Sequence, residues 1–200
     1  MAIFTDLLNQ GRTNLAMPGF VHGRDWYRER ARATQNINVS RLINGNQDHI
    51  KANVMPGHMY IFNYDPKHKE TLPFYDRYPI VFPIKIEADS FLGLNLHYLP
   101  HLYRAKLMDA LYDLTTDKKF DEKTRLRLSY NLLNSATKYK YFEPCVKRYL
   151  KSHVRSRFLN IPSNEWDIAL FLPLERFTVS KSKVYQDSIN KIRNDTWHSI

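Results

Sequence analysis

Cysteine is nearly absent from this chain of 200 residues, which has one, at position 145. A lone thiol forms no intramolecular disulfide and does not supply the clustered Cys and His ligands of a structural zinc site. We expect Cys145 to be a small buried side chain. The eight histidines form no such cluster either, because Pro100 prevents one continuous helix from presenting both His97 and His101. The sequence therefore predicts neither a disulfide nor a metal site.

Glycine is also scarce, with six residues, and the chain has no G-x-x-x-x-G-K-[ST], G-x-G-x-x-G or G-x-S-x-G motif. These motifs build phosphate-binding loops, dinucleotide sites and the nucleophile turn of many hydrolases. We therefore predict no cofactor. No apolar run approaches the roughly 20 residues that cross a bilayer, and the N-terminal sequence lacks the basic-then-apolar order of a signal peptide. We expect a soluble protein without a membrane partner.

Positive charge is what the chain has in excess. Its formal net charge is +10, and residues 101–200 hold 19 Lys or Arg against 11 Asp or Glu, a difference of +8. The densest part is Lys138–Arg157, here called the cationic segment, in which Glu143 is the one carboxylate. Its seven cations are Lys138, Lys140, Lys147, Arg148, Lys151, Arg155 and Arg157. Aromatic residues are interleaved with them, and this mixture predicts a polyanionic partner such as double-stranded DNA.

The spacing of the cationic segment predicts a helix from Pro144 to about Ser156. Proline needs no N–H donor, so it suits the first turn of a helix. At 3.6 residues per turn, the packed face would hold Val146, Leu150, His153 and Val154, and the exposed face Lys147, Arg148, Lys151 and Arg155. An ordinary solvated face is the alternative, although such faces usually interleave acidic residues, which this one lacks.

Residues 1–57 are predicted to form an extended N-terminal arm, because glycine and proline interrupt them. The one strongly periodic piece is Asp25–Arg32, predicted as a short helix capped by Asp25. Three arginines would project from it and add to the DNA contacts: Arg28, Arg30 and Arg32. Residues 58–200 are predicted to form a single α+β domain.

Three β-rich runs follow the arm, at residues 58–64, 79–87 and 91–99. They combine alternating apolar and polar residues with β-branched and aromatic side chains. Pro83 has no donor for a sheet hydrogen bond, so it predicts a sheet edge or a β-bulge. Three strands in so short a stretch predict a small, bent antiparallel sheet or a partial barrel.

Helical periodicity dominates residues 100–192. Besides the cationic segment, helices are predicted at residues 100–114, from Thr116 or Asp121 to Leu132, at 166–171 and at 184–192. The predicted fold class is therefore α+β, with the bent sheet first, a helical C-terminal half and an extended N-terminal arm.

The loop between the first two strands concentrates aromatic residues, prolines and paired charges. Pro73 and Pro79 restrict its backbone. Four of its residues are predicted to dock a neighbouring subunit or to stack on bases: Tyr75, Asp76, Arg77 and Tyr78. The alternative is that these rings only cover one end of the sheet.

A nuclease is the enzymatic alternative that the positive charge suggests, because phosphodiester hydrolysis usually needs clustered carboxylates that hold divalent cations. Asp76 and Glu87 are the residues on which such an activity would depend. Carboxylates in loops beside proline are more often turn-formers. We therefore predict no catalytic residues and no enzymatic activity.

Four runs carry a family resemblance: MYIFNYDPKHKETLPFYDRYPIVFPI, FLGLNLHYLPHLYRAKLMDALYDL, KYFEPCVKRYLKSHVRSRFLNI and EWDIALFLPLERF. They resemble virion proteins of T-even-like myoviruses, the DNA end protector family, from about Trp26 to Ser188. The resemblance implies a minor structural protein that binds the ends of packaged linear DNA, shields them from host exonucleases and uses no cofactor. It also implies a place in the virion, in the host cytoplasm during assembly, with other phage structural proteins as partners in a symmetric assembly.

The same basic surface also suits a different kind of virion protein. A neck, tail or baseplate protein would use it to contact acidic subunits, without DNA. Location at the head-tail connector would favour DNA ends, whereas location in the baseplate or tail would favour an assembly role.

Overall fold

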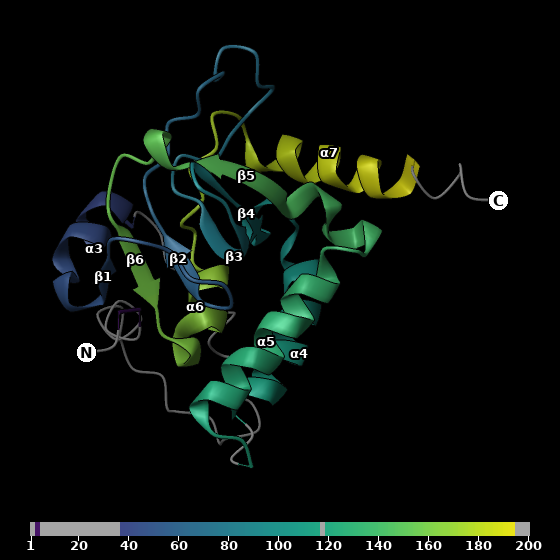
Figure 1. The fold of residues 1–200 in the computed structure, drawn as a ribbon. Coiled ribbons are helices and arrows are strands. Elements are labelled where there is room, and N and C mark those ends of the chain that lie inside the picture. The colour runs from purple at the N-terminus through teal and green to yellow at the C-terminus, as the bar shows by residue number, and fades with distance from the viewer. Residues whose placement is uncertain (1–2, 5–36, 117–118, 195–200) are drawn as a thin grey trace, which may run out of the picture.

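The computed structural model describes residues 3–4, 37–116 and 119–194. Its centre is a six-stranded antiparallel sheet in the order β1-β6-β2-β3-β4-β5 (Figure 1). The strands are β1 (Ile50–Lys51), β2 (Met59–Ile61), β3 (Ile80–Ile86), β4 (Ser90–Asn95), β5 (Val146–Leu150) and β6 (Phe158–Ile161). The α-helices are α3 (Val39–Gly45), α4 (His101–Thr116), α5 (Glu122–Ala136), α6 (Trp166–Phe171) and α7 (Lys181–Asn194). The predicted α+β class is confirmed.

Short 3-10 helices join several of these elements. They are η1 (Gln47–His49), η2 (Leu96–Tyr98), η3 (Lys140–Cys145), η4 (Lys151–His153) and η5 (Ser163–Glu165). No helix within residues 37–116 and 119–194 is long and apolar enough to cross a bilayer.

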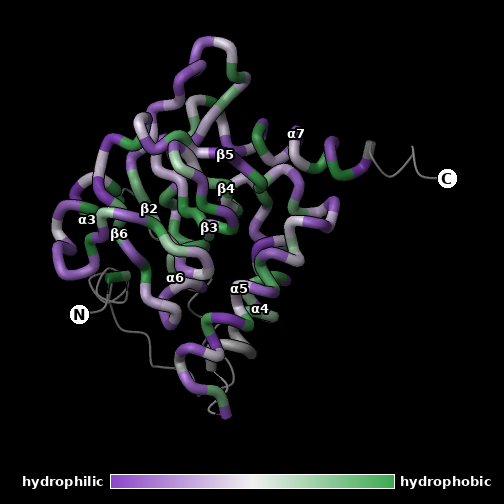
Figure 2. Tube along the Cα trace, in the orientation of Figure 1, coloured by the Kyte–Doolittle hydropathy of each residue, from purple (hydrophilic) through white to green (hydrophobic). Residues whose placement is uncertain are grey.

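Each face of the sheet has its own hydrophobic core, because successive strand side chains point to opposite faces. Met59, Ile61 and Phe82 belong to the larger core, which includes residues of the helices. Tyr60 and Val81 belong to a smaller, mainly aromatic core on the other face. Figure 2 shows the hydrophobic residues gathered in the central strands. The central strands β2 and β4 and most of β3 are therefore buried on both sides.

The sheet is strongly bent, as predicted. β5 and β6 lie on different sides of β2, β3 and β4, yet only residues 151–157 join them along the chain. This connection also bonds to the chain that follows β2: Arg155 N donates to Asn63 O at 2.8 Å, and Asp65 N donates to His153 O at 3.1 Å. The sheet therefore curls around its smaller core.

A β-bulge interrupts β3 at the predicted position. The pairing of β3 with β4 shifts register between Pro83 and Lys85. β3 lies inside the sheet, between β2 and β4, so the bulge rather than an edge accommodates the proline.

Gly93 of β4 faces this bulge and allows the two strands to approach closely. A β-carbon there would overlap the Val81 side chain and lie 3.0 Å from Phe82 O. Gly93→Ala is therefore expected to lower the free energy of unfolding by roughly 1–3 kcal/mol, the usual effect of overpacking a core. Denaturant unfolding measures it.

Gly45→Ala is the matched control, because a β-carbon at that end of α3 meets no atom within 4 Å. It should be neutral or stabilise the protein by about 0.4–1 kcal/mol. Equal effects of the two substitutions would contradict the close approach at Gly93.

The cationic segment does not form the predicted helix. Pro144 lies in η3, and Val146–Leu150 forms strand β5, which pairs with β4. Val146, Tyr149 and Leu150 are the apolar residues of this five-residue stretch, and their spacing is compatible with a strand as well as with a helix. The strand forms because β4 is available for pairing. β1 and β6 were also missed, because two and four residues are too short to show a period.

The helices outside the cationic segment agree with their predictions. α4 and α6 occupy the expected positions, and α7 begins three residues before its expected start. Asp121 caps α5, because its Oδ1 accepts a hydrogen bond of 2.7 Å from Thr124 N.

Part of the segment predicted as an N-terminal arm packs on the sheet. Val39, Leu42 and Ile43 of α3 are buried, and β1 pairs with β6. Ile3 and Phe4 are also buried, and their main-chain N–H groups donate to the Glu165 carboxylate at 2.8 and 3.1 Å. The predicted helix Asp25–Arg32, with Arg28, Arg30 and Arg32, lies outside the described residues.

Candidate nucleic-acid interface

A groove of about 340 Å³ lies between β5 and the loop that follows β2. β5 is the last strand of the sheet as described, and the loop, at the top of Figure 1, forms the opposite wall. Its polar and aromatic lining includes Lys67, His68, Tyr75, Tyr98, Lys147 and Arg148. The groove therefore brings cations of the cationic segment next to Tyr75 and Asp76 of the loop.

Two lysines of the cationic segment are engaged within the molecule. Lys147 Nζ lies 4.2 Å from the centroid of the Tyr98 ring, and burial lowers the pKa of its ammonium group. Lys151 Nζ donates to the main-chain oxygens of Glu87 at 2.6 Å and Ala88 at 3.0 Å. These two side chains hold β5 and the β3–β4 turn in place.

Two arginines of the segment form exposed ion pairs. Arg148 Nη1 bonds to Glu87 Oε2, and Arg155 Nη2 lies 3.5 Å from Asp65 Oδ2. Both guanidinium side chains keep about half of their surface exposed, at 52% and 50%. The unneutralised cationic face predicted from sequence is therefore partly paired.

Each of these carboxylates is shared by a second cation. Glu87 also contacts Lys85 at 3.3 Å, and Asp65 also contacts Lys69 at 3.0 Å. The hydrogen bond from Arg148 lowers the pKa of Glu87, and the hydrogen bond from Lys69 lowers the pKa of Asp65, so both carboxyls are ionised at neutral pH. Two cations around one carboxylate leave one positive charge at each of these places.

The other cations of the segment lie at its two ends. Lys138 and Lys140 are exposed where α5 gives way to η3, and Arg157 is exposed just before β6. None of the three lines the groove. Lys138 and Arg157 have no carboxylate partner within the described part of the chain.

The loop residues predicted as an interface divide into two kinds. Arg77 is exposed, and Tyr75 and Tyr78 are partly exposed. Asp76 is 3% exposed, and its Oδ2 lies 2.6 Å from His97 Nδ1 while its Oδ1 accepts from the main-chain N–H groups of Tyr78 and Arg176. Asp76 fixes the loop from inside the protein, so its carboxylate does not face a partner.

Sequence reasoning missed the basic residues of the loop that complete this surface. Lys67, His68 and Lys69 are all exposed, and the first two line the groove. The run K-H-K was a visible signal. The sequence alone does not show that this run lies beside β5, which is about 80 residues later in the chain.

The described residues offer little for hydrolytic chemistry. No group of three or more His, Cys, Asp or Glu side chains among them is arranged to hold a metal ion. Asp76 and Glu87, the nuclease candidates, are bonded to His97 and Arg148. Cys145 is buried as predicted, and burial raises the pKa of its thiol to about 12, so it is not a nucleophile at neutral pH.

Comparison with known proteins identifies a family. Neither a curated protein nor a solved structure matches the chain. A family model described as phage T4 terminal DNA protecting protein matches residues 25–195. The family is protective rather than enzymatic, so the nuclease hypothesis does not hold. Because the match spans most of the chain and agrees with the resemblance seen in the sequence, the protein belongs to the phage T4 terminal DNA protecting protein family.

Proposed function

We propose that this protein binds the ends of linear double-stranded phage DNA and covers them within the virion. The family match over residues 25–195 carries this proposal. Other phage structural proteins are its proposed neighbours in a symmetric assembly. The alternative of a neck, tail or baseplate protein that acts without DNA gains no support from that match.

The proposed DNA contacts are made to phosphates by exposed cations of the cationic segment. Arg148 and Arg155 would leave their partners Glu87 and Asp65 for a phosphate at little cost, because exposed ion pairs are worth about 0–1 kcal/mol. Arg157 requires no such exchange. A guanidinium forms strong paired hydrogen bonds with phosphate, and contacts of this kind carry no sequence information. Binding should therefore be independent of sequence.

The rest of the segment has a supporting or an additional role in this proposal. Lys147 and Lys151 hold β5 rigid, through the Tyr98 ring and the carbonyl oxygens of the β3–β4 turn. Lys138 and Lys140 extend the positive surface towards α4. Arg28, Arg30 and Arg32 stay further candidates for DNA contact, and Tyr75, Arg77 and Tyr78 for contact with bases or a neighbouring subunit.

Competition among three polyanions tests the function. Binding to a labelled blunt linear duplex is measured over a salt series, with unlabelled linear duplex, covalently closed circular duplex or polyglutamate as competitor. We expect linear duplex to compete best, because it alone has ends, and the affinity to fall steeply with salt as counterions are displaced. Protection of the linear duplex from an exonuclease should rise in parallel.

Equal competition by circular DNA per nucleotide would show that the protein does not recognise ends. Stronger competition by polyglutamate than by either DNA would favour an acidic protein partner instead.

A further inference from the structure

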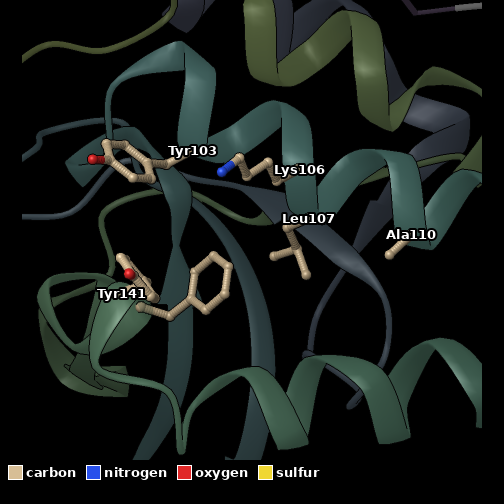
Figure 3. Close-up of a pocket in the computed structure, with 6 residues that line it drawn as sticks. Tyr103, Lys106, Leu107, Ala110 and Tyr141 are labelled. Atoms are coloured by element: carbon tan, nitrogen blue, oxygen red, sulfur yellow. The ribbon is translucent and has the colours of Figure 1, made fainter.

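A second hollow lies away from the groove, between α4 and η3. It has a volume of about 460 Å³. Its lining is Tyr103, Lys106, Leu107 and Ala110 of α4, with Tyr141 and Phe142 of η3. Figure 3 shows the Tyr103 and Tyr141 rings together at one end of the hollow, with Leu107 and Ala110 further along α4. The hollow has an apolar wall and an aromatic end.

Tyr141 is exposed to solvent and Tyr103 is half-buried. Their rings lie nearly parallel, with an interplanar angle of 25° and centroids 6.2 Å apart. Tyr141 is 56% exposed. Tyr139, two positions earlier, is 62% exposed, and Leu102, which precedes Tyr103 on α4, is 68% exposed. Tyr103 and Tyr141 line the hollow, whereas most other aromatic residues in the described part of the chain are buried or half-buried, so the two rings indicate a binding surface.

One lysine lines the hollow, and two more lie close to Tyr141 in the sequence. Lys106 lines the hollow, and Lys138 and Lys140 are exposed in the stretch of chain that carries Tyr141. Glu143, the one carboxylate of the cationic segment, is bound to Lys191 of α7, with Nζ and Oε1 2.8 Å apart. The ligand that fits is therefore anionic and also carries a flat ring. A nucleotide has both features, with a phosphate for the lysines and a base for the tyrosines.

We propose that this hollow binds an unpaired nucleotide at the DNA end, its base stacked on Tyr141 and Tyr103 and its phosphates beside Lys106, Lys138 and Lys140. This inference rests on the proposed function and gives a physical basis on which the protein would distinguish a DNA end from continuous duplex. Bases inside a duplex are stacked on both faces, whereas an unpaired terminal base has a free face for an aromatic ring. The volume is within the range of small-ligand pockets, about 300–1,000 Å³.

An acidic protein segment fits less well. It would satisfy the lysines but has no flat group for the two parallel rings, and the wall formed by Leu107 and Ala110 would meet charged side chains. The nucleotide uses the rings, the apolar wall and the cations together.

The test compares two labelled duplexes of equal length, one blunt and one with a single-stranded overhang of a few nucleotides on the same end. Fluorescence anisotropy at fixed salt gives both dissociation constants. We expect the full-length protein to prefer the overhang by roughly 5-fold to 100-fold, the effect of stacking about one base on an aromatic side chain. Tyr141→Ala should remove this preference and leave blunt-end binding within about 2-fold, because the phosphate contacts of Arg148, Arg155 and Arg157 remain.

Two matched variants make the result specific. Tyr141→Phe keeps the ring face and should keep the preference. Tyr139→Ala removes an equally exposed tyrosine two positions away that does not line the hollow, and it should keep the preference too. Both tyrosines are more than half exposed, so the variants should fold, which thermal unfolding checks.

Several outcomes would overturn the inference. The wild-type protein could bind both duplexes equally, or Tyr141→Ala could retain the overhang preference. Displacement of the overhang by polyglutamate but not by a short single-stranded oligonucleotide would assign the hollow to an acidic protein. Binding of the blunt duplex alone would refute this inference and leave the proposed function standing, whereas binding of neither duplex would refute both.

Discussion

Replacing Arg148, Arg155 and Arg157 together with alanine is expected to weaken duplex binding by roughly two to three powers of ten at about 0.1 M salt. Each phosphate contact that is lost should also reduce the slope of log affinity against log salt by about 0.9, or about 2.7 for three contacts. Folding should be preserved, because the three side chains are exposed and two of them form only surface ion pairs. Salt titrations of wild type and variant measure both effects.

A charge-matched triple variant separates local contact from net charge. Lys123 and Arg127 on α5 and Lys183 on α7 are exposed cations outside the cationic segment. Changing these three to alanine removes the same formal charge of three. It should leave the salt slope nearly unchanged, because long-range attraction is largely screened beyond about 10 Å at 0.1 M salt. Equal losses in the two triple variants would show that the arginines around β5 do not form the interface.

Local signals in the sequence were sufficient to predict much of the fold. The alternation in residues 58–64 and 91–99 predicted β2 and β4, although both strands are shorter than predicted and residues 96–98 form η2 instead of strand. A proline without a donor predicted a sheet edge or a bulge, and β3 has the bulge. Thr116 or Asp121 was predicted to cap the second helix, and Asp121 caps α5 through its bond to Thr124. In each case the signal lies within a few residues of the structure that it determines.

The cationic segment shows where such local reasoning fails. Val146, Leu150 and Val154 have the spacing of a helical face, but β5 forms because β4 offers a partner strand more than 50 residues away. Pairing brings Tyr149 against Phe91 and buries it in the aromatic core. The burial of a large ring is worth more than the propensity of five residues for a helix.

The charges of the candidate site were visible in the sequence, but their partners were not. Arg148 pairs with Glu87, 61 residues away, and Arg155 with Asp65, 90 residues away. A count of carboxylates within the segment found only Glu143 and so predicted an unpaired face. Glu87 lies in the β3–β4 turn and Asp65 in the loop that follows β2, and the fold brings both next to the cationic segment. No short-range pattern in the sequence indicates these contacts.

Arg104 is a sharper example, because within helix α4 it reads as one more surface cation. It is instead fully buried, and Glu175 Oε1 lies 2.8 Å from its Nη2. Its guanidinium donates to three main-chain carbonyls and one hydroxyl: Leu99 O at 2.7 Å, Leu170 O at 2.8 Å, His97 O at 2.9 Å and Tyr185 Oη at 2.7 Å. The side chain therefore ties α4 to α6, α7 and η2.

Arg104→Met is expected to lower the free energy of unfolding at pH 7 by roughly 3–5 kcal/mol, the usual cost of removing one partner from a buried ion pair. Methionine has an unbranched, flexible side chain that fills irregular space, so little of this loss comes from a cavity. The loss arises because the Glu175 carboxylate and the carbonyl oxygens keep their burial without their donor. Urea unfolding measures it.

The loss should also depend on pH. Burial alone would raise the pKa of the Glu175 carboxyl, but His97, Arg104 and Lys181 together hold it well below its ordinary value. Such a carboxyl stabilises the fold above its unfolded pKa of about 4.3, and this stabilisation is lost as the pH falls through its folded pKa. Without Arg104 the folded pKa rises, so the difference in stability between wild type and variant should be largest near pH 7 and should narrow in acid.

Two controls identify the buried charge as the cause. Lys106→Met removes an exposed cation from the same helix and should change stability by no more than about 0.5 kcal/mol. In Arg104→Met the buried Glu175 carboxylate keeps only Lys181 and Tyr185 as partners. Combining Arg104→Met with Glu175→Gln removes that carboxylate, so the double variant should regain part of the stability at pH 7 and lose most of the pH dependence. The unbonded carbonyl oxygens remain in that double variant, and for this reason recovery should be incomplete. An Arg104→Met protein whose deficit does not narrow at any acidic pH at which both proteins stay folded would show that packing, rather than the charge on Glu175, makes this arginine necessary.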